Sequence, residues 1–138
     1  MTVTPSDFLG TWAISREIDD FKAGATAQFT GKAVIAEASC NWDYSEEGQL
    51  SLAGGYKMQA NRSYIWSPRE GGFDVFFEDG RFFHHIPLLP KAEASHWCDP
   101  DQYEVSYDFS LWPEWRSTWR VNGPRKNYVM TSKFNPLV

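Results

Sequence analysis

The sequence has no long hydrophobic run and no basic stripe, and these two absences exclude two kinds of partner. A transmembrane helix needs about 20 consecutive apolar residues, and the chain nowhere contains such a run. Nucleic-acid binding depends on Lys and Arg gathered against phosphates, whereas here 13 basic residues are scattered among 18 acidic ones, for a net charge of -5. We therefore expect no nucleic-acid partner and no membrane partner.

Cysteine is also scarce, and a secretory pattern is missing. The start, MTVTPSDFLG, has no basic segment followed by an apolar one, which is the arrangement of a signal peptide. Cys40 and Cys98 are then expected as free thiols in a reducing compartment, although a disulfide between them stays open. The expected location is cytoplasmic.

The chain contains neither a linker nor a low-complexity tract. Its 138 residues suffice for one domain with a sizeable core and are too few for two ordinary ones. We therefore expect a single domain over residues 1–138. Aromatic residues make up 17% of it, including seven Trp, which favours a fold with broad half-buried surfaces.

Apolar residues alternate with polar ones in short runs rich in Val, Ile, Tyr, Phe and Trp, and Gly, Pro, Asn and Asp separate these runs. Alternation with a period of two predicts β-strands, and the separators predict turns. The expected strands cover residues 11–18, 27–38, 41–47, 57–66, 72–79, 81–86, 103–109, 114–121 and 127–134.

A meander of about nine strands either leaves two exposed edges or closes on itself, and closure removes the edges. The sequence therefore predicts an all-β fold, a single closed antiparallel up-and-down β-barrel of about eight to ten strands. A short helical turn over residues 4–10 precedes it, with Phe8 and Leu9 expected to plug one end. Barrels of this size hold about one small ligand.

Two sets of residues resemble known proteins. Gly10 and Trp12 in FLGTW resemble the G-x-W signature of the calycins, the lipocalins and fatty-acid-binding proteins. In that group an Arg from a late strand packs across the Trp. The resemblance implies this role for Arg120, with Arg116 as second candidate.

A second resemblance covers nearly the whole chain. The runs FEDGRFFH, HWCDPDQYEVSYDF and the Trp-rich segment that ends in GPRKNY are similar to an uncharacterised bacterial family of small cytoplasmic, calycin-like (lipocalin-like) proteins, a domain of unknown function. The resemblance implies the barrel. The calycin group implies small hydrophobic or haem-like ligands, or occasional isomerase and lyase activities.

Two arginines share the phase of apolar neighbours and are expected to point into the barrel. Arg16 shares a strand face with Trp12 and Ile14, and Arg62 shares a strand face with Tyr64. A buried Arg must be paired or face a ligand, and the partners left open are Glu37, Asp43 and Glu46. The predicted ligand-binding residues are Arg16, Arg62, Trp66, His84, His96, Tyr107, Trp119 and Tyr128.

All three histidines lie in RFFHHIPLLPKAEASHWC, residues 81–98. Neighbours on a strand face opposite ways, so His84 and His85 cannot both point inward. One of them with His96 and Cys98 would supply zinc-type ligands, but there is no CxxC or HExxH spacing. We therefore predict no metal site, although metal binding by His84, His96 and Cys98 stays open. The sequence does not identify a cofactor.

The composition favours binding of a small hydrophobic or aromatic molecule inside the barrel, and an anionic group on that molecule stays open. One alternative is an isomerase or lyase on the same barrel, with His84 or His96 and Tyr107 as acid and base. Another alternative is a protein-interaction module that exposes Trp112 and Trp115. A homodimer also stays open.

Overall fold

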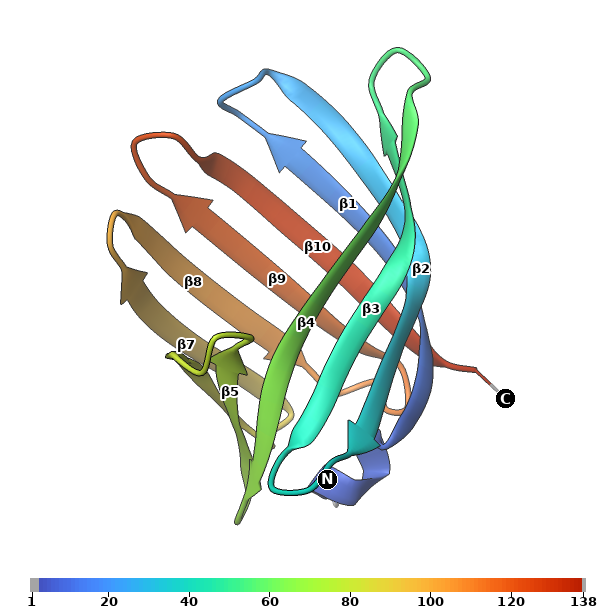
Figure 1. Ribbon diagram of the computed structural model, residues 1–138, viewed down its shortest axis with the longest axis vertical. Helices are drawn as coiled ribbons and strands as arrows, with labels where there is room; N and C mark the ends of the chain where they lie inside the picture. Colours follow the sequence, from blue (N-terminus) through green and yellow to red (C-terminus); the bar gives the residue numbers. More distant parts are fainter. Residues whose placement is uncertain (1–2, 138) are drawn as a thin grey trace.

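The computed structural model describes residues 3–137 and shows one ten-stranded antiparallel sheet rolled into a barrel (Figure 1). It confirms the all-β, up-and-down fold with a short helical turn before it. The elements are the 3₁₀ helix η1 (Pro5–Phe8) and the strands β1 (Gly10–Asp20), β2 (Ala25–Glu37), β3 (Trp42–Leu52), β4 (Lys57–Arg69), β5 (Gly72–Phe77), β6 (Phe82–Pro87), β7 (Lys91–Cys98), β8 (Asp101–Asp108), β9 (Trp115–Asn122) and β10 (Asn127–Pro136). Among the described residues, no helix is long and apolar enough to cross a membrane.

The strands pair in the order β6-β5-β4-β3-β2-β1-β10-β9-β8-β7. Most ladders join neighbours along the chain, and the β1–β10 ladder brings the first and last strands together. β6 and β7 lie next to each other, but no ladder joins them within residues 3–137. The barrel is therefore nearly closed, where the sequence predicted a closed one, and we call the boundary between β6 and β7 the seam.

The ranges predicted from alternation do not include β7. Lys91–Cys98 begins KAEA, and Lys, Ala and Glu are all depleted in strands. Pro87 and Pro90 precede it and are typical of a break in regular structure. Its pairing with β8 over eight residues shows that tertiary context decides the conformation of this segment.

Side chains rather than backbone hydrogen bonds close the seam. The rings of Phe83 on β6 and His96 on β7 have centroids 5.7 Å apart. His84 Nε2 and Tyr107 Oη are 2.9 Å apart, and this hydrogen bond connects β6 to β8 past the intervening β7. The histidine-containing stretch therefore forms both sides of the seam.

A β-bulge in β6 places two consecutive side chains inside the barrel. Val75 pairs with His84 whereas Phe76 pairs with Phe82, which leaves Phe83 as the extra residue. His84 is 2% exposed, while 45% of the His85 side chain is exposed. The predicted opposite orientation of His84 and His85 is confirmed.

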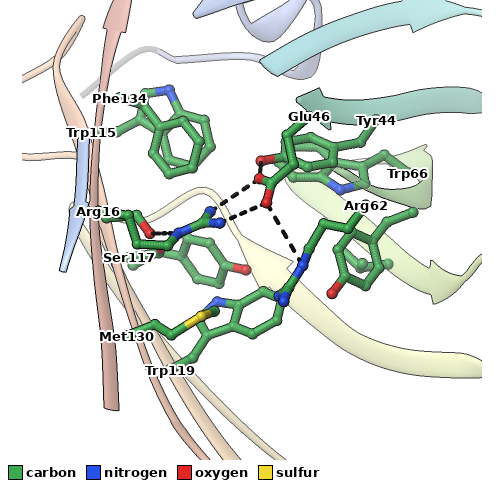
Figure 2. Close-up of a pocket in the computed structure, with 14 residues that line it drawn as sticks. Arg16, Tyr44, Glu46, Arg62, Trp66, Trp115, Ser117, Trp119, Met130 and Phe134 are labelled. Carbon is green, nitrogen blue, oxygen red and sulfur yellow. Dashed lines mark hydrogen bonds and ion pairs between the residues drawn. The ribbon is translucent and has the colours of Figure 1, made fainter. Parts of the chain in front are cut away.

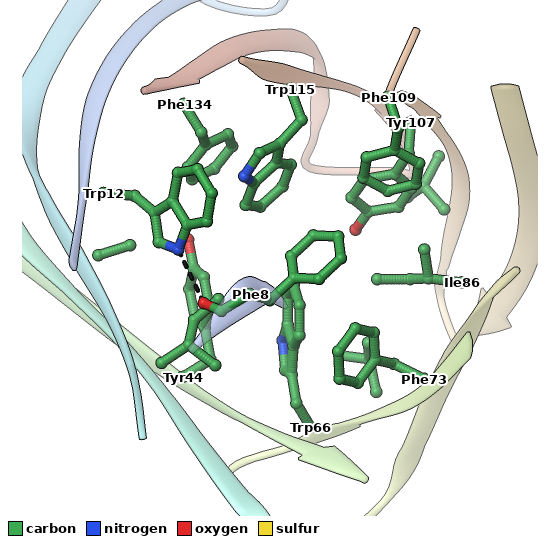
Figure 3. Close-up of a cluster of buried hydrophobic side chains, with 14 of the residues drawn as sticks. Phe8, Trp12, Tyr44, Trp66, Phe73, Ile86, Tyr107, Phe109, Trp115 and Phe134 are labelled. Carbon is green, nitrogen blue, oxygen red and sulfur yellow. Dashed lines mark hydrogen bonds between the residues drawn. The ribbon is translucent and has the colours of Figure 1, made fainter. Parts of the chain in front are cut away.

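The barrel interior holds a buried ion pair midway (Figure 2) and an aromatic plug at the end near η1 (Figure 3). Phe8 of η1 is 1% exposed and lies among the rings of Phe73, Phe109 and Trp112, at centroid distances of 5.3, 5.5 and 4.7 Å. Trp12 Nε1 donates to the carbonyl oxygen of Phe8 at 2.9 Å. Phe8 therefore plugs this end of the barrel, as predicted, and the hydrogen bond from Trp12 holds η1 against β1.

The arginine that the calycin resemblance implied does not pack across Trp12. Arg120 and Arg116 are both exposed on the outer face of β9. Trp119 and Val121 point inward, so strand alternation directs Arg120, which lies between them, to the outside. The implied role is wrong for both arginines, and aromatic rings surround Trp12 instead.

The opposite end of the barrel is open. Interior-facing side chains near η1 are buried, whereas those toward the β1–β2 and β3–β4 turns are only half-buried. The half-buried group is mostly apolar or aromatic: Ile18, Leu50, Ala60, Tyr64, Phe77, Tyr103 and Tyr128. A molecule therefore meets apolar walls when it approaches from this end.

Replacing Phe8 with Ala should lower the free energy of unfolding by about 3–5 kcal/mol, because it empties the centre of the plug. Urea unfolding followed by tryptophan fluorescence measures the change. Phe21→Ala is the control, since Phe21 is exposed on the β1–β2 turn and should cost less than about 0.5 kcal/mol. Equal losses in the two variants would contradict the role of Phe8.

Candidate functional site

Arg16 on β1 and Glu46 on β3 form a buried ion pair in the middle of the barrel (Figure 2). Arg16 Nη1 and Nη2 donate to Glu46 Oε1 and Oε2 at 2.6 and 3.0 Å. Arg16 Nε donates to Ser132 Oγ on β10 at 2.6 Å, and Tyr44 Oη donates to Glu46 Oε2 at 2.6 Å. Only 7% and 3% of the two charged side chains are exposed, so the strands supply the partners that buried charges require.

Two paired glycines allow β2 and β3 to approach closely beside the ion pair. Gly31 on β2 pairs with Gly48 on β3, and a Cβ on Gly48 would lie 2.6 Å from Gly31 Cα and 2.8 Å from Phe29 Cζ. Gly48 leaves space for the Phe29 ring, which lies over the Arg16 guanidinium with 5.1 Å between Arg16 Cζ and the ring centroid. The contact adds a cation–π interaction to the buried Arg.

The surroundings keep the pair charged. Burial by itself would raise the pKa of Glu46, but hydrogen bonds and charge from Arg16 hold that pKa below its usual value. Burial opposes the charge of Arg16, yet Glu46 raises the pKa of Arg16. Burial also raises the pKa of Tyr44 well above its usual value. Its hydroxyl therefore stays protonated and donates to the carboxylate.

Arg62 on β4 adds a second positive charge at this place. Arg62 Nε lies 3.8 Å from Glu46 Oε1, and 39% of the Arg62 side chain is exposed. This distance is short enough for an ion pair but too long for a hydrogen bond. Two guanidinium groups and one carboxylate leave this cluster with one net positive charge.

The enclosed space beside the ion pair, which we call the inner cavity, measures about 20 Å³. That volume holds about one water molecule. The strand number predicted a wider interior, and the difference arises because aromatic rings and the two arginines fill the barrel. The lining includes Arg16, Tyr44, Glu46, Arg62, Tyr64, Trp66, Tyr107, Trp119 and Met130.

Two further hollows adjoin the inner cavity. The end hollow, of about 90 Å³, lies toward the open end and is lined by Arg16, Ile18, Phe29, Glu46, Leu50, Ala60, Asn61, Arg62 and Met130. The lateral hollow, wide and shallow at about 510 Å³, is lined by Asn61, Arg62, Ser63, Tyr64, Phe77, Glu78 and Asp79. Arg62 is the residue that borders all three.

The structure brings five of the eight predicted ligand-binding residues together around the inner cavity: Arg16, Arg62, Trp66, Tyr107 and Trp119. Tyr128 is half-buried toward the open end, and His84 and His96 lie at the seam. Of the acidic partners left open for Arg16, Glu46 is the one that pairs with it. Tyr44 and Ser132 were not predicted, although alternation places Tyr44 on the same face as Glu46.

His84 is a neutral, buried base. Burial, with a smaller effect from the charges of His96 and His85, lowers the pKa of His84 to about 3. Burial raises the pKa of its partner Tyr107. An acid and a base tuned this far from neutrality are poorly matched to proton transfer near pH 7, so the contact acts chiefly as a link across the seam.

The residues considered for metal binding do not form a ligand cluster. Within residues 3–137, no group of three or more His, Cys, Asp or Glu side chains is arranged to hold a metal ion. His85 Nδ1 instead contacts Asp74 Oδ1 at 2.8 Å on the outside. Cys98 Sγ accepts a weak hydrogen bond from Arg81 Nη1 at 3.7 Å, and Cys40 and Cys98 are free thiols.

The two tryptophans considered for a protein-interaction surface point inward. Trp115 is buried and stacks on Phe134, with ring centroids 3.8 Å apart. Trp112 packs against Phe8. The alternative prediction of an exposed aromatic patch built on Trp112 and Trp115 is therefore wrong.

Replacing Glu46 with Gln should lower the free energy of unfolding at pH 7 by about 3–5 kcal/mol, because Arg16 then stays buried without a counter-charge. Urea unfolding measures the loss. The double variant R16M/E46L removes both charges and should lose less. A double variant less stable than E46Q would contradict this account.

The same pair predicts acid sensitivity. The pKa of Glu46 is lowered in the folded protein from an unfolded value near 4.5. The stability that the charged Glu46 contributes is therefore fully present above pH 4.5, and it is lost as the pH falls through the pKa of Glu46 in the folded protein. Below pH 4.5 the stability of wild-type protein should fall more steeply than that of R16M/E46L.

His84 predicts a second pH effect, at milder pH. Its pKa is about 3 folded against an unfolded value of 6.5, so the stability it contributes is complete above pH 6.5 and is lost as pH falls toward 3. From pH 7 to pH 5 the wild-type free energy of unfolding should fall by about 2 kcal/mol through this group. Urea unfolding of His84→Gln should show a flatter profile between pH 7 and pH 5 than that of the wild type.

Comparisons with known proteins agree with this architecture. The chain is similar in structure to the S-type phycobiliprotein lyase CPES from Guillardia theta, with a TM-score of 0.63 and 8% sequence identity over 96% of this chain and 91% of that one. At this identity the likeness shows the fold alone, and it supports the calycin-like barrel. No curated protein matches the sequence. The model of the family of unknown function DUF6314 matches residues 8–136, and the chain therefore belongs to that family.

Proposed function

We propose that the protein binds a small anionic molecule with an apolar or aromatic body at the open end of the barrel, and that Arg62 binds its anionic group. The observation that carries the proposal is the position of Arg62 at the border of the inner cavity, the end hollow and the lateral hollow. No other described residue lines all of them.

Charge supports an anionic ligand. Glu46 already accepts two hydrogen bonds from Arg16 and one from Tyr44. Arg62, at 3.8 Å from the same carboxylate, is left with a guanidinium that an incoming carboxylate or phosphate can bind in a bidentate manner. Such a ligand also neutralises the net positive charge of the three-residue cluster.

The walls support an apolar body. Ile18, Phe29, Leu50 and Met130 line the end hollow beside Arg62, and this mixture of apolar walls with a few placed polar groups is typical of small-molecule sites. The end hollow alone accommodates only a small group. We therefore place the remainder of the ligand toward the open end, where Leu52 and Met58 are exposed.

The shared fold with a phycobiliprotein lyase supports a small-molecule site in a barrel of this shape. Catalysis by His84 or His96 with Tyr107 stays a prediction. Neither histidine lines the inner cavity, the end hollow or the lateral hollow, so binding is favoured over acid–base chemistry. We further propose a reducing, cytoplasmic setting, in keeping with the two free thiols.

Anilinonaphthalene sulfonate and the neutral N-phenylnaphthylamine have similar aromatic bodies and differ in the anionic group, so they separate the two parts of the site. Arg62→Met should weaken sulfonate binding roughly tenfold or more, because a charge-assisted contact is lost. Binding of the neutral probe should change little, since Met keeps the apolar stem. Fluorescence titration of the native protein measures both affinities.

Arg120→Met is the matched control, because Arg120 is exposed on the outer face of β9. Arg62→Lys should keep part of the sulfonate affinity through its charge. The proposal fails if wild-type protein binds neither probe, or if R62M and R120M weaken sulfonate binding equally.

A further inference from the structure

One part of β4 has an unpaired edge. β4 pairs with β3 from Lys57 to Trp66, but β5 pairs with β4 only from Tyr64 to Arg69. Within residues 3–137, the backbone of Lys57–Ser63 therefore has no strand on its second side. At about 3.4 Å per residue this edge is roughly 24 Å long.

This edge carries few of the usual protections against strand addition. Such protections are Pro, a bulge, a very short strand and charged side chains, and here they are limited to Lys57 and the inward-pointing Arg62. The segment KMQANRS contains no Pro, its pairing with β3 is regular, and its outward-facing Gln59 and Asn61 are exposed and uncharged. The edge is therefore open to another strand.

We propose that the strand is the same segment of a second copy of this chain, so that two protomers pair antiparallel along Lys57–Ser63. A two-fold axis at Ala60 makes the segment its own partner. Gln59 then lies opposite Asn61, and Lys57 lies opposite Ser63 of the other copy. This is the isologous arrangement of two-fold dimers, and it does not depend on ligand binding.

The length of the free edge matches this occupant. At one end the edge stops at Tyr64, where β5 takes the place beside β4. At the other end Lys57 is preceded by a turn that returns to β3 and includes Gly54 and Gly55, both with positive φ. The segment from the second copy therefore fits between these limits and continues the line of β5.

Charges favour the same pairing. Ser63 lines the lateral hollow with Glu78 and Asp79 of the β5–β6 turn. Asp79 already pairs with Arg81, so the pairing brings Lys57 of one copy beside Glu78 of the other, and the two-fold axis repeats the contact. Arg62 lies opposite Met58, whose exposed thioether chain covers the guanidinium stem without a like-charge clash.

The dimer completes the wall around Arg62. The added strand covers the lateral hollow, so the space beside Arg62 opens only toward the end of each barrel. Met58 of each copy contributes to the site of the other.

Analytical ultracentrifugation of the full chain over a range of concentrations, with hydrogen exchange of the backbone amides, tests the proposal. Wild-type protein should show a monomer–dimer equilibrium, and exchange in 57–63 should slow as the concentration rises. The Q59K/N61K variant places Lys opposite Lys twice and should weaken the dimer roughly tenfold. The Q59E/N61K variant pairs opposite charges at the same positions and should restore it.

T26K/Q28K is the control variant. It adds the same two lysines at exposed positions of β2, which is paired on both sides, and its dimerisation should equal that of the wild type. The proposal is overturned if the wild type stays monomeric at every concentration. It is also overturned if Q59K/N61K and Q59E/N61K dimerise equally well.

Discussion

The buried pair of Arg16 and Glu46 is the constraint on which the barrel interior depends. Removing two charges from water costs several kcal/mol for each ion unless geometry and hydrogen bonds compensate. Here the compensation comes from β1, β3 and β10 together, through Ser132 and Tyr44. The registers of the β1–β10 and β2–β3 ladders must therefore be correct for the pair to form, because a slip of one residue would turn these side chains to the outside.

The pair also divides the interior into two parts with different roles. On one side, the aromatic plug around Phe8 fills the barrel and leaves no path inward. On the other side, half-buried apolar walls face the open end, with Arg62 between them and the pair. Buried aromatic packing is concentrated near η1, and solvent-exposed interior surface is concentrated at the opposite end. A ligand of the kind proposed would therefore bind at the mouth of the barrel rather than at its centre.

Alternation of side chains accounts for what could be predicted from the sequence. It identified nine of ten strands, the inward phase of Arg16 and Arg62, and the opposite orientation of His84 and His85. It could not choose between Glu37, Asp43 and Glu46 as the partner of Arg16, because that choice depends on the register between strands. It missed β7, whose local composition is unfavourable for a strand. The small volume of the inner cavity depends on how rings pack in three dimensions, which a one-dimensional pattern does not contain.

The seam between β6 and β7 has a consequence for how the chain assembles. Every ladder except β1–β10 joins consecutive strands, so β1–β6 and β7–β10 are two meanders built from local contacts. Local contacts form quickly, and distant ones carry a larger loop-closure cost. Among the described residues, the β1–β10 ladder is then the one that joins strands far apart in the sequence. Linking the end of β10 to η1 and opening the chain at Leu88–Pro90 would give a circular permutant in which every ladder connects sequence neighbours.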